Sequence, residues 1–234
     1  MDFGERAVLV TGAAGNLGRA VAAAFAEHGA RLVLIDQTRD GLARAFGSDS
    51  DIRLFAPLDL LDLEATHAMA RRAAERFGGV GILCNLAGGF HMGEPVHETL
   101  DSVLGRMLDL NARTLLNAVR AVVPVMLAGG GGKIVNVGAF AAQRGGARMG
   151  AYAAAKSVVI RLTESLAAEL REKNINVNCV LPTIIDTPEN RKAMPDADPG
   201  RWVSPDALAA VILFLASDAA RAVHGAALPV TGLS

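Results

Sequence analysis

The chain is poor in aromatic residues, in cysteines and in net charge. Aromatics make up 4% of the 234 residues, and the formal net charge is −1. Nucleic-acid binders rely on basic surfaces and stacked rings, and anionic membranes also attract basic surfaces, so neither partner is expected. The two cysteines, Cys84 and Cys179, lie inside apolar strand-like runs. They are therefore expected to be buried free thiols.

The sequence also lacks long apolar runs, metal-ligand spacings and the layout of a signal peptide. Its apolar runs end well short of the ~20 residues that a membrane-spanning helix needs. The five histidines show no spacing that would make a metal site. The first residues lead directly into a strand-like segment. A soluble, cytoplasmic protein without a metal is the expectation.

What the chain does have is a regular alternation of strand and helix patterns. The expected strands are residues 6–11, 32–36, 52–56, 80–85, 133–138, 175–181 and 227–231. Between them, helices are expected up to about residue 28 and over residues 62–77, 99–128 and 150–172, and another begins at residue 204. Residues 99–128 form one long helix or two, because Gly105 and Pro124 interrupt the pattern. This alternation predicts one α/β domain over residues 1–234, with a parallel sheet covered by helices on both faces.

A glycine-rich loop joins the first strand to the first helix. It reads TGAAGNLG over residues 11–18. Glycine in this position lets the backbone turn tightly, approach a pyrophosphate and pack the helix against the sheet, and the helix N-terminus then faces the phosphates. The sequence therefore predicts a dinucleotide site whose candidate residues in this loop are Gly12, Ala14, Gly15, Asn16, Leu17 and Gly18.

An acidic residue ends the second strand. Asp36 follows Gly18 by 18 residues, near the spacing at which a carboxylate reaches the adenosine ribose. Such a carboxylate accepts hydrogen bonds from both ribose hydroxyls and repels a 2′-phosphate. Gln37 and Thr38 come next, and no arginine directly follows the acid. NAD(H) is therefore expected to be preferred over NADP(H).

A tyrosine and a lysine stand four residues apart in an alanine-rich run. Tyr152 and Lys156 share one face of the expected helix, so the ammonium can lie beside the phenol. A free phenol titrates near ~10, and a nearby cation lowers that pKa toward the range that acid–base catalysis needs. The pair is expected to perform proton transfer beside the dinucleotide.

Together these motifs resemble the short-chain dehydrogenase/reductase family. The resemblance rests on TGAAGNLG, Asp59 in PLDL, NLAGG at residues 85–89, Asn111 and YAAAK, which keep the family's order over essentially the whole chain. It implies a Rossmann-type doubly wound sheet, a nicotinamide cofactor and oxidoreductase activity on a small molecule. It also implies a homo-oligomer, a dimer or a homotetramer, formed through the long helices.

The resemblance assigns roles to individual residues. Tyr152 would exchange the proton with the substrate, Lys156 would hold the nicotinamide ribose and depress the tyrosine pKa, and Asn111 would support a water relay from a helix kink. The remaining cofactor contacts implied are Asp59 and Leu60 at the adenine, Asn85, Ala87 and Gly88 on the adenosine side, and Pro182, Ile185 and Thr187 at the nicotinamide end. A lid is expected near residues 183–204. Just before it the family usually has Pro-Gly, whereas this chain has Pro182-Thr183.

One expected catalytic residue is missing. The family has a serine 13 residues before the tyrosine, but this chain has Ala139 there, preceded by Gly138. Losing such a hydrogen-bond donor typically costs about 10²–10³ in kcat. Three explanations stay open. The protein is a weakened or silent relative, another donor such as Gln143 or His91 replaces the hydroxyl, or the substrate needs less help.

The third explanation fits a further resemblance, to dihydropteridine reductase. It rests on ILCNLAGGF, on the Gly138–Ala139 pair and on DTPENRKAMPDADPGRW at residues 186–202. That branch reduces a conjugated imine with NADH and has alanine at the serine position. The alternatives are a carbonyl reductase or secondary alcohol dehydrogenase of the 3-oxoacyl type with weakened activity, and a catalytically silent NAD(H)-binding protein. Trp202 is either an anchor of the lid or part of its closing surface.

Overall fold

A parallel sheet forms the centre of the molecule, as the alternating pattern predicts. The computed structural model describes residues 1–4 and 6–234. Its seven strands lie in the order β3-β2-β1-β4-β5-β6-β7, and every neighbouring pair is parallel. The order reverses between β1 and β4, which is where open sheets of this kind bind ligands at the carboxyl ends of their strands. The strands are β1 (Ala7–Thr11), β2 (Arg31–Asp36), β3 (Arg53–Pro57), β4 (Ile82–Asn85), β5 (Gly132–Val137), β6 (Ile175–Pro182) and β7 (Ala227–Val230).

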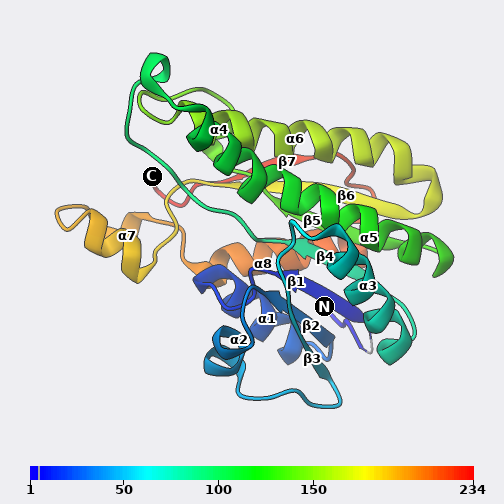
Figure 1. The fold of residues 1–234 in the computed structure, drawn as a ribbon. Helices are drawn as coiled ribbons and strands as arrows, with labels where there is room; N and C mark the ends of the chain where they lie inside the picture. The colour runs from blue at the N-terminus through cyan, green and yellow to red at the C-terminus, as the bar shows by residue number, and fades with distance from the viewer. Residues whose placement is uncertain (5) are drawn as a thin grey trace.

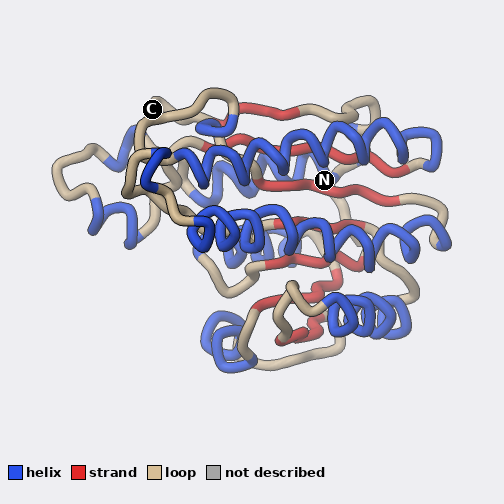
Figure 2. Tube along the Cα trace, turned by 45° about the horizontal axis from the view of Figure 1, so that its top comes forward, coloured by secondary structure: helices blue, strands red, loops and turns tan. Residues whose placement is uncertain are grey.

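Helices cover both faces of the sheet and make a three-layered molecule (Figures 1 and 2). One apolar core lies between the sheet and α3, α5 and α6, and the other between the sheet and α1, α2 and α8. In β1, Leu9 belongs to the first core and Val8 and Val10 to the second, because successive side chains of a strand point to opposite faces. The helices are α1 (Asn16–Glu27), α2 (Arg39–Phe46), α3 (Leu63–Phe77), α4 (Asp101–Leu108), α5 (Thr114–Ala128), α6 (Gly150–Leu170), α7 (Pro188–Ala193) and α8 (Pro205–Ala216).

The long helical stretch from residue 99 to 128 is divided by a π turn, not at a glycine or a proline. The turn spans Asp109–Arg113 and separates α4 from α5. Gly105 lies inside α4 and Pro124 inside α5, so neither ends its helix. The break therefore falls on Asn111, the residue for which a kink was expected.

The expected lid contains more regular structure than its proline-rich sequence indicates. Residues 188–193 form α7, which projects at the carboxyl edge of the sheet (Figure 1). Trp202 is only 8% exposed, and the neighbouring Val203 forms a bridge with Ile185. Trp202 is therefore an anchor of this segment. The predicted start of the last helix is confirmed, because the Ser204 hydroxyl accepts a hydrogen bond from the backbone N–H of Ala207 and Pro205 is the first helical residue.

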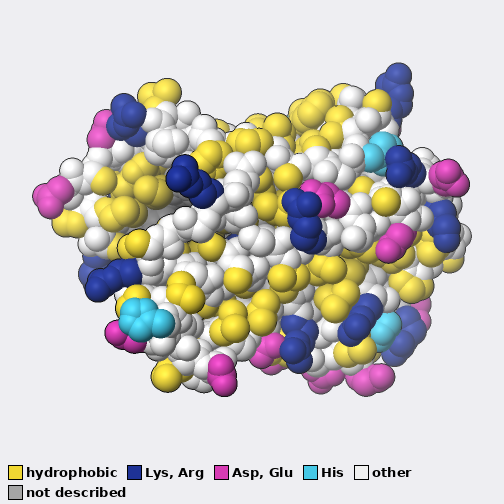
Figure 3. All heavy atoms as spheres, turned by 90° about the horizontal axis from the view of Figure 1, so that it is seen from above, with side chains coloured by type: hydrophobic (Ala, Val, Ile, Leu, Met, Phe, Trp, Pro, Cys, Tyr) yellow, Lys and Arg dark blue, Asp and Glu magenta, His cyan; other side chains and the backbone are white. Residues whose placement is uncertain are grey.

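Two expectations from composition can be checked directly. Cys84 and Cys179 are both buried free thiols, as predicted, and burial raises the pKa of Cys179 to about 11. Among the described residues, no helix has the length and apolarity that crossing a bilayer requires. Seen from above, apolar side chains are spread over the face, and charged side chains gather mainly at its rim (Figure 3).

Candidate active site

A groove of about 610 Å³ lies at the point where the strand order reverses. Most of the residues predicted to contact a cofactor line it. They are Gly12, Ala14, Gly15, Asn16, Leu17, Gly18, Asp36, Asp59, Leu60, Ala87, Gly88, Ile185 and Thr187. Of the four remaining predicted contacts, Asn85 and Pro182 are buried in the sheet, and Tyr152 and Lys156 lie on α6. Lys156 Nζ is close to Gly88, which lines the groove.

The glycine-rich loop is shaped by contacts that leave no room for side chains. Gly12 has φ +63°, in the left-handed region. A Cβ at Gly18 would lie 2.2 Å from the carbonyl oxygen of Gly12, so only glycine allows α1 to approach the loop this closely. Gly15 caps α1, and no side chain accepts a hydrogen bond from the first turn. The N–H groups of that turn are therefore available to an anion in the groove.

Asp36 is held at the edge of the groove by backbone hydrogen bonds. Its Oδ2 accepts from the N–H of Ala14 at 2.9 Å, and its Oδ1 accepts from the N–H of Gln37 at 2.8 Å. The carboxylate thus joins the glycine-rich loop to the end of β2. Four neighbours that sequence reasoning did not single out as contacts also line the groove here, namely Gln37, Thr38, Gly41 and Arg44. Their nearness to Asp36 in sequence was the available signal.

Two of the predicted contacts, Asn85 and Pro182, do not line this groove, and their role in holding the cofactor stays a prediction. Asn85 is 4% exposed, and its Nδ2 donates to Asn136 Oδ1 at 2.9 Å, because its side chain points across the sheet toward β5. Asn136 Nδ2 in turn donates to Thr163 Oγ1 on α6. Asn85 therefore ties β4 to β5 and α6. Pro182 is the buried last residue of β6, and Ile185 and Thr187 reach the groove instead.

The tyrosine and the lysine both lie on α6, as predicted. Lys156 is 5% exposed, and its Nζ donates to the carbonyl oxygen of Val137 at 2.8 Å. A Cβ at Gly88 would lie 3.2 Å from Lys156 Nζ and 2.7 Å from Asn111 Oδ1. Gly88 lines the groove, so the Lys156 ammonium and the Asn111 side chain both lie beside this part of the groove wall.

The expected lowering of the tyrosine pKa is wrong for the protein alone. Burial raises the pKa of Tyr152 to about 12. Burial also lowers the pKa of Lys156 to about 8, and the nearby Cys179 thiol opposes that change. In the absence of a cofactor the lysine is bonded to Val137 and not to the phenol, so desolvation decides both shifts.

Asn111 occupies the π turn and bonds to three backbone groups. Its Nδ2 donates to the carbonyl oxygens of Met107 and Gly89, and its Oδ1 accepts from the N–H of Gly89, each at 3.1 Å. The turn tilts the asparagine toward the segment after β4 and away from the regular helix ladder. This is the local geometry that a helix kink was expected to provide.

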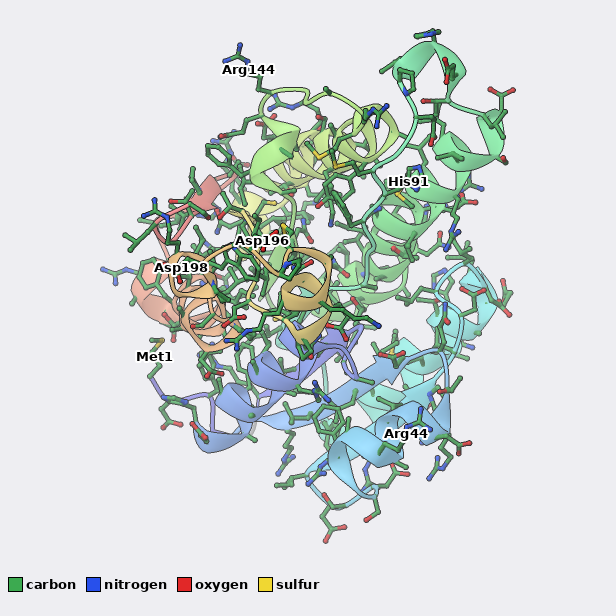
Figure 4. The ribbon with its side chains drawn as sticks, turned by 90° about the vertical axis from the view of Figure 1, so that its left-hand side faces the viewer. Met1, Arg44, His91, Arg144, Asp196 and Asp198 are labelled. Atoms are coloured by element: carbon green, nitrogen blue, oxygen red, sulfur yellow. The ribbon has the colours of Figure 1, made fainter. Side chains whose placement is uncertain are left out.

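No hydroxyl or amide among the described residues is hydrogen-bonded to the phenol of Tyr152. Ala139 is 4% exposed, and the Tyr152 hydroxyl makes no hydrogen bond within the part of the chain that the structure describes. Gln143 is exposed, and His91 Nε2 is 3.1 Å from Glu94 Oε2. Figure 4 shows His91 in the upper part of the view, on the segment after β4, and Arg44 in the lower part, on α2. Neither Gln143 nor His91, the two candidate donors, is bonded to the phenol.

An aromatic residue instead contacts the tyrosine. The rings of Phe90 and Tyr152 meet edge to face, with their centroids 4.9 Å apart and an interplanar angle of 78°. Phe90 remains 62% exposed, and Phe140, next to Ala139, is 42% exposed. Sequence reasoning missed both phenylalanines, although each directly follows a motif residue. Tyr152 therefore has apolar neighbours, namely Phe90 and the cluster formed by Met107, Ala151 and Ala155.

The groove's residues fit a nicotinamide dinucleotide. The uncapped N-terminus of α1 suits the pyrophosphate, and the held carboxylate of Asp36 suits ribose hydroxyls. The glycine at residue 18 permits close approach of the helix, and the ammonium of Lys156 stands at the far end. A dinucleotide spanning the groove would thus place its reactive ring near Tyr152.

Comparison with known proteins agrees with this geometry. The family model "short chain dehydrogenase" matches residues 6–198. The chain is 35% identical over 240 residues to a cis-4-hydroxycyclohexanecarboxylate dehydrogenase of Sinomonas cyclohexanicum, covering 98% of this chain and 96% of that one. It is also 35% identical over 239 residues to a D-threitol dehydrogenase of Mycolicibacterium smegmatis, covering 97% and 92%.

A solved structure extends the likeness to three dimensions. Carveol dehydrogenase from Mycobacterium avium, in complex with NAD, superposes with a TM-score of 0.88 at 29% identity, covering 98% of this chain and 97% of that one. The parallel sheet flanked by helices agrees with this likeness. The chain therefore belongs to the short-chain dehydrogenase/reductase family of oxidoreductases.

Proposed function

We propose that this oxidoreductase transfers hydride between NAD(H) and a small cyclic secondary alcohol or the corresponding ketone. The observation that carries the proposal is the apolar surrounding of Tyr152, whose ring meets Phe90 and packs against the cluster of Met107, Ala151 and Ala155. Apolar walls favour a hydrocarbon ring over an open polyol. The names of two similar proteins support a ring, since cis-4-hydroxycyclohexanecarboxylate and carveol are both ring alcohols.

The chain's own residues supply the proton chemistry and the binding. The dinucleotide, when bound, accepts or donates the hydride. Tyr152 takes the proton from the substrate hydroxyl in oxidation, or gives it to the carbonyl oxygen in reduction. Lys156 holds the nicotinamide ribose, and its positive charge stabilises the phenolate. Asn111 keeps the segment after β4 in place beside both groups.

The cofactor is proposed to be NAD(H) because Asp36 faces the groove. Its carboxylate is fixed by the N–H groups of Ala14 and Gln37 and would repel a 2′-phosphate. Arg44 also lines this end and is the cation available to a phosphate. NADH should therefore give the higher kcat/KM, and a higher value with NADPH would overturn the assignment.

A second candidate is reduction of a conjugated C=N or C=C substrate, such as a quinonoid dihydropterin. Ala139 favours it, because hydride addition to a conjugated system builds no localised alkoxide that a serine would have to stabilise. The similar proteins described above are named as alcohol dehydrogenases, and that favours an alcohol or ketone over a conjugated C=N or C=C substrate. A silent NAD(H)-binding protein is the third outcome.

One panel separates these candidates. The purified protein is assayed with NAD⁺ on cyclohexanols and open-chain polyols, and with NADH on cyclohexanones, quinonoid dihydropterin, quinones and cyclic imines. Tyr152→Phe serves as the control and should remove most turnover while leaving NADH affinity nearly intact. Turnover confined to ring alcohols and ketones supports the proposal. Turnover confined to dihydropterin or imines supports the second candidate, and NADH binding without any turnover supports the silent protein.

The same protein is proposed to be a homo-oligomer. Leu100 and Leu104, at the start of α4, are 66% and 38% exposed, and Val158 on α6 is 36% exposed. Burial of these side chains against a second copy would stabilise a dimer or tetramer. A monomer in sedimentation equilibrium would contradict this.

A further inference from the structure

A side chain of the lid segment bonds to the glycine-rich loop. Glu189, in the first turn of α7, accepts a hydrogen bond on Oε2 from Asn16 Nδ2 at 2.8 Å. Asn16 is the first residue of α1 and lines the groove. Arg19 Nη2 donates to Asn16 Oδ1 at 2.7 Å and completes a chain of three side chains. The chain runs from α1 to α7 across the rim of the groove.

This contact is the side-chain hydrogen bond that ties α7 to the opposite wall. The other side-chain hydrogen bonds of α7, among the described residues, stay within its own segment. Asn190 Nδ2 donates to the carbonyl oxygen of Ile185, its N–H donates to Thr187 Oγ1, and Arg191 pairs with Asp186. Without the Asn16–Glu189 contact, α7 has no side-chain hydrogen bond to the opposite wall among the described residues.

The residues that α7 holds are those that face the groove. Ile185 and Thr187 line it, and Asn190 on α7 bonds to both. Thr187 is also the N-cap of α7, so a shift of the helix moves the threonine directly. Fixing α7 therefore fixes the wall at the end of the groove where Ile185 and Thr187 are expected to meet the nicotinamide.

We propose that Glu189 is a positioning residue whose contact with Asn16 closes α7 over the bound dinucleotide and slows its release. The proposal rests on dinucleotide binding, which is part of the proposed function, and is independent of the substrate. Leaving the groove requires α7 to swing away from α1, and that movement breaks the Asn16–Glu189 hydrogen bond. Arg19 offsets the carboxylate's charge beside the expected pyrophosphate.

The expected effect is modest because the contact is exposed. Exposed hydrogen-bonded and ionic contacts change an equilibrium or a rate by about two- to fivefold. The opposite effect is also physically possible, because a carboxylate near a pyrophosphate repels it. Removing Glu189 would then tighten binding. The sign of the change in NADH release therefore decides whether Glu189 holds the bound dinucleotide or repels it.

The test is the dissociation rate of NADH from the full chain. Energy transfer from Trp202, the chain's single tryptophan, to bound NADH reports release in a stopped-flow displacement experiment. Glu189→Ala should raise the rate about two- to fivefold. Glu189→Gln keeps a carbonyl acceptor for Asn16 and should recover part of the loss. Lys192→Ala, a change on the same helix at a residue whose side chain makes no hydrogen bond or ion pair within the described chain, should leave the rate unchanged.

A double-mutant cycle makes the assignment specific to the pair. Asn16→Ala combined with Glu189→Ala should release NADH no faster than the faster single variant, because both changes remove one contact. Thermal melting verifies that each variant is folded. An unchanged or slower rate in Glu189→Ala, or fully additive effects, would overturn the inference. If the unaltered protein binds no NADH, it is the proposed function that fails.

Discussion

Asn111 and Gly89 bond to each other twice, side chain to backbone, across the gap between the π turn and the segment after β4. The asparagine amide donates to the glycine carbonyl and accepts from its N–H, each at 3.1 Å. Gly88, the preceding residue, lies between Asn111 Oδ1 and Lys156 Nζ. The π turn thus connects the helix to the wall beside the catalytic lysine.

Asn111→Ala should reduce both stability and turnover. The change leaves the backbone groups of Gly89 without their partner, which costs about 1–3 kcal/mol for buried polar groups. Displacing this wall from Lys156 should lower kcat by about 10²-fold, at the low end of what proton transfer contributes. Asn178→Ala is the matched control. Asn178 bonds the carbonyl of Val223 and the N–H of Ala226 in the same way, in a strand away from the groove. Equal kcat losses in the two variants would contradict the assignment.

Ala139→Ser tests what the missing hydroxyl means. The position is buried with φ −158° and ψ 149°, a conformation that serine adopts without strain. If the substrate is a ring ketone, the new donor should raise kcat by up to about 10²-fold. Ala147→Ser, an exposed change in the loop before α6, should have no effect. A loss of activity in Ala139→Ser would instead favour the conjugated imine, whose reduction suits alanine.

Gly18→Ala should separate α1 from the glycine-rich loop. The new Cβ would lie 2.2 Å from a backbone oxygen, and backbone atoms cannot move aside cheaply. We expect a loss of about 1–3 kcal/mol in stability together with loss of NADH binding. Gly105→Ala is the contrasting change, because nothing lies within 4 Å of its added Cβ inside α4. It should stabilise the protein by about 0.5–1 kcal/mol. Urea unfolding and NADH titration of both variants measure the difference.

Local patterns predicted much of the fold and part of the site. The order of strands and helices, the glycine-rich loop and the positions of Asp36 and Tyr152 all follow from short-range signals such as apolar periodicity and residue spacing. Asn111 could be placed in a helix kink because family motifs keep their order along the chain. These features depend on neighbours in the sequence or on the end of a single strand.

The features that were not predicted depend on residues far apart in the chain. Glu189 meets Asn16 across 173 positions, and Phe90 meets Tyr152 across the gap between β4 and α6. Asn85 was assigned to the groove, whereas packing turns it toward Asn136. The pKa of Tyr152 was expected to fall, but burial, which no spacing reveals, raises it.

Tyr152 should titrate near 12 in the protein without cofactor. It is the chain's only tyrosine, so the ultraviolet absorbance of the phenolate reports this residue alone. The folded pKa lies above the ordinary value of 10.0, so the folded chain keeps a proton that the unfolded chain loses between pH 10 and 12. This residue's contribution to stability therefore declines as pH rises through that window. A midpoint at or below 10 in the folded, cofactor-free protein would show that Lys156 outweighs burial.

Lys156 should have the opposite effect on stability in a lower pH window. Burial lowers its pKa from 10.5 to about 8, so between those values the unfolded chain binds a proton that the folded chain does not. The free energy of unfolding therefore rises with pH across the window, by roughly 3 kcal/mol in full and about 1 kcal/mol by pH 9. The buried thiols lower the free energy of unfolding as pH rises above 9, because burial raises the pKa of Cys179 from 9.0 to about 11.

Lys156→Met isolates this effect, because it keeps the volume and removes the charge. The two thiols are present in both proteins, so their contribution largely cancels when the unfolding free energies are subtracted. At pH 7 the variant should be the more stable protein, and its advantage should shrink as pH rises from 8 toward 10.5. Urea unfolding at pH 7, 8 and 9 measures the difference. An advantage that stays constant from pH 7 to 9 would mean that the folded and unfolded chains bind the same number of protons at Lys156, so that burial does not lower its pKa.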